Sequence, residues 1–368
     1  MRVSSTVKPS LLAQTKQDLE TIIDELGERP YRVKQILDWI YTKRVDKIEN
    51  MSDVPAKLRE KLAEEYTLHT LEHISVNGAK DTTQKFLLKL DDGRYVETVL
   101  IPANIGDGGI QAERRTLCVS SQVGCAYGCK FCASGLAGFT RNLRPEEIIG
   151  QILTVEKISG EKINNIVFMG MGEPMANYKN LDKALDIITG QWGVNIGARR
   201  INVSTSGLAP QIKLLADRGQ QIRLAISLHG ATDEVRERIM PVNKKYPLKE
   251  LIDALRYWKT HSKQKFTFEF ILIKGVNDSF DQARQLAKLA KSLHAKVNLI
   301  PYNTVEGLEW ERPALQHCKD FAAIVHKAGV TTTLRNEKGH DIAAACGQLR
   351  LKQETAEGII EAPVKTKK

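Results

Sequence analysis

The sequence predicts an α/β protein: a partial (β/α)6 barrel preceded by a small helical domain and a β-hairpin extension. Three observations support this. After residue 115, short apolar runs alternate six times with helical stretches, which is typical of parallel strands joined by right-handed crossovers. Residues 15 to about 65 carry apolar residues at helical spacing, whereas residues 70 to 101 contain short alternating runs.

The N-terminal segment, for which we set the boundary at 1–68, is expected to form a small helical bundle. Its run ERPYRVKQILDWIYTKRVDKIENM places apolar residues at helical spacing, namely Ile36, Leu37, Ile40 and Tyr41. The opposite side would be a basic face formed by Arg32, Lys34, Lys43 and Arg44. A merely solubilising helix surface would show the same pattern, so this face alone does not identify a partner.

Residues 69–115 are expected to form the β-hairpin extension and a linker. The runs QKFLLKL and RYVETVLIP flank Asp91-Asp92-Gly93, which favours a tight hairpin turn. We assign 116–350 to the barrel, with VTTTLR as a candidate edge strand. The polar segment 351–368 is expected to be a poorly ordered tail.

Composition describes a soluble protein with a surplus of positive charge. The chain has 368 residues with 54 basic and 44 acidic side chains, a formal net charge of +10. This favours a polyanionic partner, although many metabolic enzymes are equally basic. The sequence shows neither a run of roughly eighteen apolar residues nor the apolar core of a signal peptide, so we expect a cytoplasmic protein without structural disulfides.

Polar residues follow five of the six predicted barrel strands. They are the cysteine loop, Gly170–Pro174, Ser204–Gly207, Ser227–His229 and Tyr302-Asn303. Because barrels of this kind carry their chemistry at the carboxyl ends of the strands, these residues are expected to surround one mouth.

The cysteine loop contains Cys125, Cys129 and Cys132 in the spacing CxxxCxxC. Three thiolates on a short loop suit either structural zinc or an iron-sulfur cluster. Structural zinc normally needs a fourth thiolate or imidazole. A cluster with only three protein thiolates keeps one iron open for a substrate or cofactor.

The loop resembles that of the radical S-adenosylmethionine (SAM) superfamily. The resemblance rests on CxxxCxxC after the first strand, Phe131 before the last cysteine, and Gly172-Glu173 after the second strand. It implies a radical SAM barrel in which the three cysteines hold one 4Fe-4S cluster. SAM would bind the open iron and be cleaved by electron transfer to a 5′-deoxyadenosyl radical.

Further strings resemble the RlmN/Cfr family of RNA adenosine methyltransferases. They are CVSSQVGC, GFTRNL, VFMGMGEPMANY, STSG, SLH, MPVNKKYPL, GVND, NLIPYN and DIAAACGQL. GFTRNL and GEP are closer to the RlmN branch, which methylates carbon 2 of adenine, than to the branch that methylates carbon 8. The implied substrate is an adenosine in the peptidyl-transferase loop of 23S rRNA and, in some members, the adenosine 3′ to the anticodon of tRNA, with the basic bundle gripping the RNA.

This resemblance also implies roles for individual residues. Cys346 is methylated by a first SAM, and the radical from a second SAM converts the methyl group into a methylene radical that adds to adenine. Glu97 then accepts the ring proton and Cys118 forms a transient disulfide with Cys346. The implied SAM-binding residues are Gly172, Glu173, Ser204, Ser227, Leu228, His229 and Asn303. Ala343 departs from the family, which commonly has an acidic residue there.

Judged by residue type alone, several of these residues could instead have purely structural roles. Cys118 and Cys318 could be buried packing residues, Glu97 a solvated strand residue, and His229 a core histidine. The rival functions are a carbon-8 methyltransferase and a non-catalytic RNA-binding protein with structural zinc. The family further implies an electron donor such as flavodoxin and a reductant for the disulfide, and a monomer is expected because one chain carries every motif.

Overall fold

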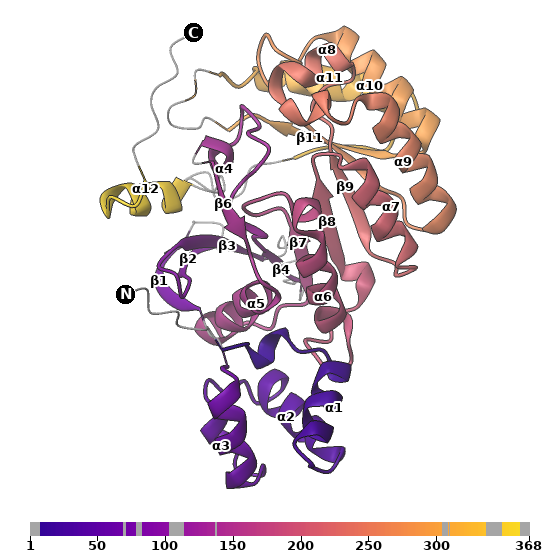
Figure 1. Ribbon diagram of the computed structural model, residues 1–368. Helices are drawn as coiled ribbons and strands as arrows, with labels where there is room; N and C mark the ends of the chain where they lie inside the picture. The colour runs from indigo at the N-terminus through magenta and orange to yellow at the C-terminus, as the bar shows by residue number, and fades with distance from the viewer. Residues whose placement is uncertain are drawn as a thin grey trace, which may run out of the picture.

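The fold is built on a ten-stranded mixed sheet, seen in the computed structural model of Figure 1. The structure describes residues 8–68, 71–78, 83–102, 114–136, 138–303, 308, 310–335 and 348–360. In spatial order the strands are β1 (Glu72–Gly78), β2 (Gln84–Lys89), β3 (Tyr95–Pro102), β4 (Arg115–Cys118), β7 (Asn165–Phe168), β8 (Ile201–Thr205), β9 (Arg223–Ser227), β10 (Thr267–Leu272), β11 (Lys296–Pro301) and β12 (Thr332–Leu334).

Strand pairing confirms the predicted partial barrel. Strands β4, β7, β8, β9, β10, β11 and β12 are parallel neighbours in chain order, whereas β1 to β4 pair antiparallel. The connecting helices are α5 (Pro145–Ser159), α6 (Tyr178–Thr189), α7 (Ala209–Asp217), α8 (Asp233–Ile239), α9 (Leu248–His261), α10 (Phe280–Leu293) and α11 (Leu315–Lys327). The hairpin extension therefore continues the barrel sheet.

The turn between β2 and β3 is the predicted one. Gly93 adopts φ +80°, and its N–H donates to Leu90 O at 3.0 Å. A positive φ at this position is accessible to glycine without a steric penalty, so Asp91-Asp92-Gly93 closes the hairpin.

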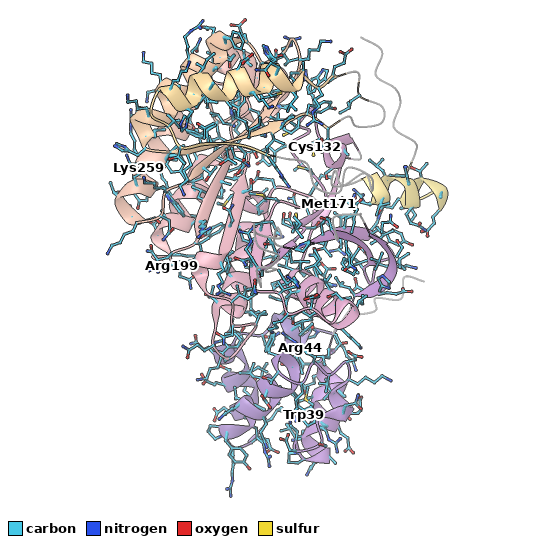
Figure 2. The ribbon with its side chains drawn as sticks, turned by 180° about the vertical axis from the view of Figure 1, so that it is seen from behind. Trp39, Arg44, Cys132, Met171, Arg199 and Lys259 are labelled. Atoms are coloured by element: carbon cyan, nitrogen blue, oxygen red, sulfur yellow. The ribbon has the colours of Figure 1, made fainter. Side chains whose placement is uncertain are left out.

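The N-terminal bundle consists of α1 (Lys16–Glu25), α2 (Tyr31–Tyr41) and α3 (Ala56–Glu65). A capping box between Thr15 and Asp18 begins α1. The predicted apolar side of α2 is buried. Arg44, expected on the basic face, instead contacts Glu156 of α5 at 2.5 Å, at the place where the bundle meets the barrel (Figure 2).

The C-terminal segment differs from the expected disordered tail. Residues Gln348–Ala356 form helix α12, which packs on β3 (Figure 1). Its side chains Arg350 and Glu354 are almost fully buried and form an ion pair at 2.8 Å. A polar segment can be buried when its charged side chains pair with one another. The residue pattern alone did not indicate this pairing. Residues 361–368 lie outside the described part of the chain.

Short elements complete the fold. A separate two-stranded ribbon is formed by β5 (Gln122–Gly124) and β6 (Phe139–Asn142), and α4 (Ala133–Leu136) lies between them in the chain. The 3₁₀ turns are η1 (Leu11–Ala13), η2 (Ile48–Asn50), η3 (Pro174–Asn177), η4 (Ala198–Arg200) and η5 (Pro241–Lys244). Within the described ranges, no helix combines the length and apolar character needed to cross a bilayer.

Candidate active site

The three thiols of the cysteine loop are presented by the β5–β6 ribbon. Cys125 N donates to Gly138 O at 2.9 Å, and Cys132 N donates to Cys129 O at 3.1 Å. At Gly124, which has φ +78°, a Cβ atom would lie only 1.9 Å from Gly138 O. Glycine is therefore required for the ribbon to close at the start of the loop.

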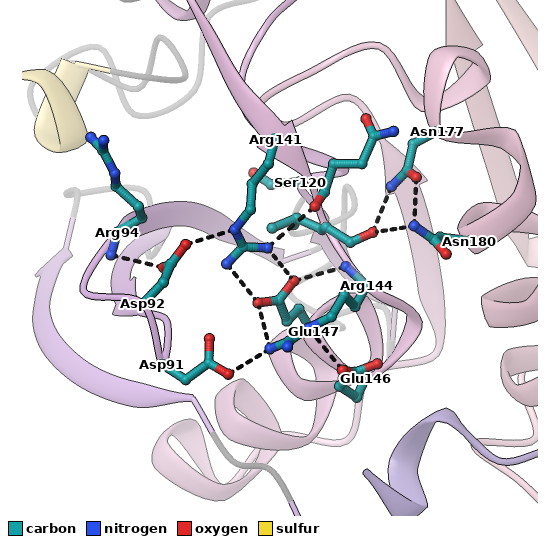
Figure 3. Close-up of polar contacts among 12 residues, drawn as sticks. Asp91, Asp92, Arg94, Ser120, Arg141, Arg144, Glu146, Glu147, Asn177 and Asn180 are labelled. Carbon is teal, nitrogen blue, oxygen red and sulfur yellow. Dashed lines mark hydrogen bonds and ion pairs between the residues drawn. The ribbon is translucent and has the colours of Figure 1, made fainter. Parts of the chain in front are cut away.

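Charged side chains fix the ribbon to the β2–β3 hairpin, as Figure 3 shows. Arg141 of β6 donates to Asp92 at 2.7 Å and to both carboxylate oxygens of Glu147 at 2.8 Å. Arg144 contacts Asp91 at 2.7 Å and Glu147 at 3.1 Å. Because the Glu147 side chain is fully buried, this network is better shielded from solvent than a surface ion pair. It holds the hairpin, the ribbon and α5 together.

Next to the loop lies a cavity of about 280 Å³ at the carboxyl ends of the barrel strands. The residues predicted for this mouth that line it are Cys125, Cys129, Cys132, Gly172, Glu173, Ser204, Ser227 and His229. Leu228 is buried and does not line it, and neither does Asn303. Within the described part of the chain, the buried Oδ1 of Asn303 has no hydrogen-bond partner, so it can accept a bond from a ligand.

Glu173 is a buried carboxylate in the wall of the cavity. It accepts hydrogen bonds from Met175 N at 3.0 Å and from Ser206 N at 2.6 Å. Burial raises its pKa above the usual range, while these hydrogen bonds act in the opposite direction. Gly172 before it has φ +95°, and a Cβ there would lie 2.4 Å from the Gln122 side chain. The turn thus brings the backbone of Gly172 and Glu173 against β5, where Glu173 N donates to Gln122 Oε1 at 2.9 Å.

His229 is buried and has a left-handed backbone conformation. It adopts φ +55°, and its Nδ1 accepts a hydrogen bond from Ile271 N at 3.0 Å. Asn277 donates to the carbonyl of His229 at 2.7 Å, and Phe131 packs edge-on to the ring at 4.8 Å. Burial, followed by the nearby Arg236 guanidinium, lowers the pKa of His229 to about 3. The ring is therefore neutral with its proton on Nε2.

Cys125, Cys129 and Cys132 lie together in the wall of the cavity. Burial raises the pKa of Cys125 to about 12 and that of Cys129 well above its usual range, and the neighbouring thiols and Glu173 add to this. Thiolates in this site would therefore need a positively charged group to stabilise them. Three thiols beside a cavity fit an iron-sulfur cluster that keeps one iron open, whereas structural zinc normally takes four protein ligands.

Comparisons with known proteins agree with this geometry. Residues 119–287 match the model of the radical SAM superfamily, and residues 10–68 match that of the ribosomal RNA large subunit methyltransferase N-terminal domain. The chain is 56% identical over 346 residues to a probable dual-specificity RNA methyltransferase RlmN of Akkermansia muciniphila, covering 94% of this chain and 96% of the relative.

The chain belongs to the RlmN family of radical SAM RNA methyltransferases. A probable dual-specificity RNA methyltransferase RlmN of Geobacillus kaustophilus is 44% identical, with 95% and 94% of the two chains covered. The crystal structure of a radical SAM methyltransferase from Sphaerobacter thermophilus superposes with a TM-score of 0.85 at 39% identity, covering 92% of this chain and 98% of that one. Membership of this family implies a 4Fe-4S cluster and SAM.

In this RlmN-family chain, Glu97 and Cys118 lie on one face of the sheet. Cys118 of β4 stands opposite Val99 of β3, and Glu97 precedes Val99 by two residues. Directly opposed residues of antiparallel strands share a face, as do alternate residues of one strand, so both side chains point the same way. Cys346 lies outside the described residues, and α12 begins two residues after it.

Ser120 connects this face to the cavity. Its hydroxyl donates to the carbonyl of Glu97 at 2.5 Å and accepts from Met171 N at 2.9 Å. Met171 directly precedes Gly172, which lines the cavity. Two hydrogen bonds therefore separate the Glu97 backbone from the cavity wall.

Two charged residues of the site were not predicted from the sequence. Arg236 is fully buried and donates to Leu228 O at 3.2 Å, to Asn243 Oδ1 at 2.7 Å and to Ser206 O, which ties the ends of β8 and β9 together. In the run DEVRERI it resembles a solvated helix residue. Glu269 lines the cavity, and burial raises its pKa to about 6. A glutamate inside the apolar strand FTFEFIL is unusual, and this position could have identified Glu269 as a candidate functional residue.

Proposed function

We propose that the protein methylates carbon 2 of an adenosine in RNA by a radical SAM mechanism that passes through S-methylated Cys346 and a transient disulfide. The substrates are the peptidyl-transferase loop of 23S rRNA and the adenosine 3′ to the anticodon of tRNA. The observation that carries the proposal is the shared face of Glu97 and Cys118, two hydrogen bonds from a cavity lined by three thiols. The dual-specificity names of the relatives support two RNA classes.

Residues around the cavity would hold the cofactors. Cys125, Cys129 and Cys132 would bind one 4Fe-4S cluster, which with SAM supplies a 5′-deoxyadenosyl radical. The residues assigned to SAM are Gly172, Glu173, Ser204, Ser227, Leu228, His229 and Asn303. Glu173 offers a buried carboxylate to the amino group of SAM, and neutral His229 has a donor at Nε2. Two SAM molecules are used for each methyl group transferred.

The residues on the shared face would complete the reaction. Once the methylene radical has joined Cys346 to carbon 2 of adenine, the odd electron left on the ring would return to the cluster, and Glu97 takes the carbon-2 proton. The Cys118 thiolate then attacks the Cys346 sulfur, forms a sulfur-sulfur bond and breaks the sulfur-methylene bond, whose electron pair stays with the methylene carbon. That carbon takes up a proton from water and becomes the methyl group. Arg350, which follows Cys346 by four residues in the sequence, donates its backbone N–H to Glu97 Oε1 at 2.8 Å.

RNA binding and electron supply involve further partners. The net charge of +10 favours RNA, and the target base must be unstacked to reach the pocket. Because Arg44 is engaged with Glu156, we assign the RNA contacts of the bundle to other basic residues such as Lys34. An electron donor such as flavodoxin and a disulfide reductant would complete the cycle in the cytoplasm.

Anaerobic turnover with defined RNA tests this proposal. Mass spectrometry of digested RNA is expected to show 2-methyladenosine, and 8-methyladenosine would instead identify a carbon-8 enzyme. Cys118→Ala is expected to accumulate a covalent RNA-protein adduct on denaturing gels. Cys318→Ala, which removes another buried thiol far along the chain in α11, is the matched control and should turn over normally. Normal turnover by Cys118→Ala would contradict the resolving role.

A further inference from the structure

A lysine and a glutamate form an ion pair inside the β2–β3 hairpin. Lys85 Nζ lies 2.8 Å from Glu97 Oε2, and neither side chain has any exposed surface. The strand register places Leu87 opposite Glu97 and Lys85 opposite Val99. Lys85 therefore stands diagonal to Glu97, on the same face of the sheet as Cys118.

Stability alone does not account for this pair. Removing two charges from water is so costly that buried ion pairs can often be replaced by apolar residues of similar volume without loss of stability. Lys85 directly precedes the apolar residues Phe86, Leu87 and Leu88, and a methionine would extend that apolar run. A lysine at this position is therefore better explained by what it does to Glu97.

The second oxygen of Glu97 is also engaged. Oε1 accepts a hydrogen bond from Arg350 N at 2.8 Å, in the first turn of α12. The N-terminus of a helix favours a negative charge through its unpaired N–H groups and its dipole. Lys85 and the first turn of α12 thus each contact one oxygen of the Glu97 carboxylate, and together they fix its orientation on the face that it shares with Cys118.

We propose that Lys85 is a positioning residue that holds the Glu97 carboxylate in place for removal of the carbon-2 proton. The inference rests on the proposed role of Glu97. The proton passes from carbon 2 to Glu97, and the electron pair of the carbon-hydrogen bond stays with the ring. Without the ammonium group, Oε2 of Glu97 would lose a buried partner, and the carboxylate would no longer be fixed from both sides.

The test compares Lys85→Met and Lys85→Arg with Lys89→Met in the cluster-loaded enzyme. Lys89 lies on the same face of β2 as Lys85, on the other diagonal from Glu97, and its ammonium group lies over the Tyr95 ring. Lys89→Met therefore removes an equal charge from this face but leaves the Lys85–Glu97 ion pair intact. Three quantities are measured: 5′-deoxyadenosine release, methylation of Cys346, and the decay of the RNA-protein adduct in a single turnover.

Lys85→Met is expected to release 5′-deoxyadenosine and methylate Cys346 like the wild type. It should resolve the adduct more slowly, by on the order of tenfold to a hundredfold, because a base that is not held in place removes the proton less efficiently. Lys85→Arg should restore part of the rate, and Lys89→Met should match the wild type. In a Glu97→Gln background, Lys85→Met should add no further slowing, because both changes act on one step.

Several outcomes would overturn the inference. Normal adduct decay in Lys85→Met would do so, as would equal slowing of 5′-deoxyadenosine release, which points to a structural role. If Lys85→Met does not fold, the double variant Lys85→Met/Glu97→Gln is compared with Glu97→Gln, and further slowing of adduct decay in the double variant rejects the inference. Failure of the proposed function is distinct, because the wild type would then form no methylated Cys346 or adduct.

Discussion

Protonation of His229 is expected to destabilise the folded protein in mild acid. The folded pKa of about 3 lies far below the ordinary value of 6.5, because burial and Arg236 disfavour the charged ring. The neutral ring thus contributes stability that is fully present above pH 6.5 and is lost as the pH falls toward 3. The loss amounts to about 1.4 kcal/mol per pH unit, or about 2 kcal/mol at pH 5.

The perturbation that isolates this effect is His229→Asn. Asparagine tolerates the left-handed backbone at φ +55° and retains an acceptor for Ile271 N, but it does not titrate. His294→Asn is the matched control, because His294 also has φ +55° but is exposed at the end of α10.

Urea unfolding at several pH values between 5 and 7.5 measures the free energy of unfolding of the three proteins. The free energy of unfolding of the wild type minus that of His229→Asn should fall by about 2 kcal/mol between pH 7.5 and pH 5. His294→Asn shows what an asparagine at a left-handed position does to the free energy of unfolding where the side chain is exposed. Parallel curves for wild type and His229→Asn would refute the conclusion that His229 is neutral because it is buried.

Three further perturbations follow from the geometry. Glu269→Gln should gain roughly 2 kcal/mol relative to the wild type between pH 4.5 and pH 8 in urea unfolding, because a carboxylate with a pKa of about 6 costs stability as it ionises. Gly172→Ala should lose about 3 kcal/mol or more from clash and strain, whereas Gly160→Ala, with positive φ but open space, should lose about 1 kcal/mol. Arg44→Met should lose about 2 kcal/mol by thermal denaturation by leaving Glu156 without this partner, and an unchanged melting temperature would contradict a role in holding the bundle to the barrel.

The barrel could be predicted because its signals are local. Each strand run of the six units is apolar and each helix carries its apolar residues on one side, so periodicity alone separates them. The placement of Glu173 and His229 around one cavity was also predictable, since residues at the carboxyl ends of parallel strands must meet at one mouth. The three-residue strand β5 was not predicted, because so short a run has no periodicity to detect.

Contacts between segments that are far apart in the sequence could not be predicted from local residue patterns. Arg350 and Glu354 are charged, and their sequence neighbours are polar, so nothing local indicates burial. They are buried because β3 offers them a surface and each supplies the other's counter-charge. The burial of Lys85 could not be predicted either, since alternation along β2 permits a lysine on either face. Such residues are recognisable only when the partner strand or helix is known.

The loop CVSSQVGCAYGCKFC separates into two kinds of thiol on physical grounds. Cys118 ends β4 and faces the Glu97 side of the sheet, whereas Cys125, Cys129 and Cys132 line the cavity beyond the β5–β6 ribbon. A strand fixes the direction of its side chains, so the pairing of Cys118 with Val99 sets the face to which its thiol points. Proximity in sequence therefore does not make a four-thiol metal site, because Cys118 shares its face with Glu97 and Lys85 and does not line the cavity with the other three thiols.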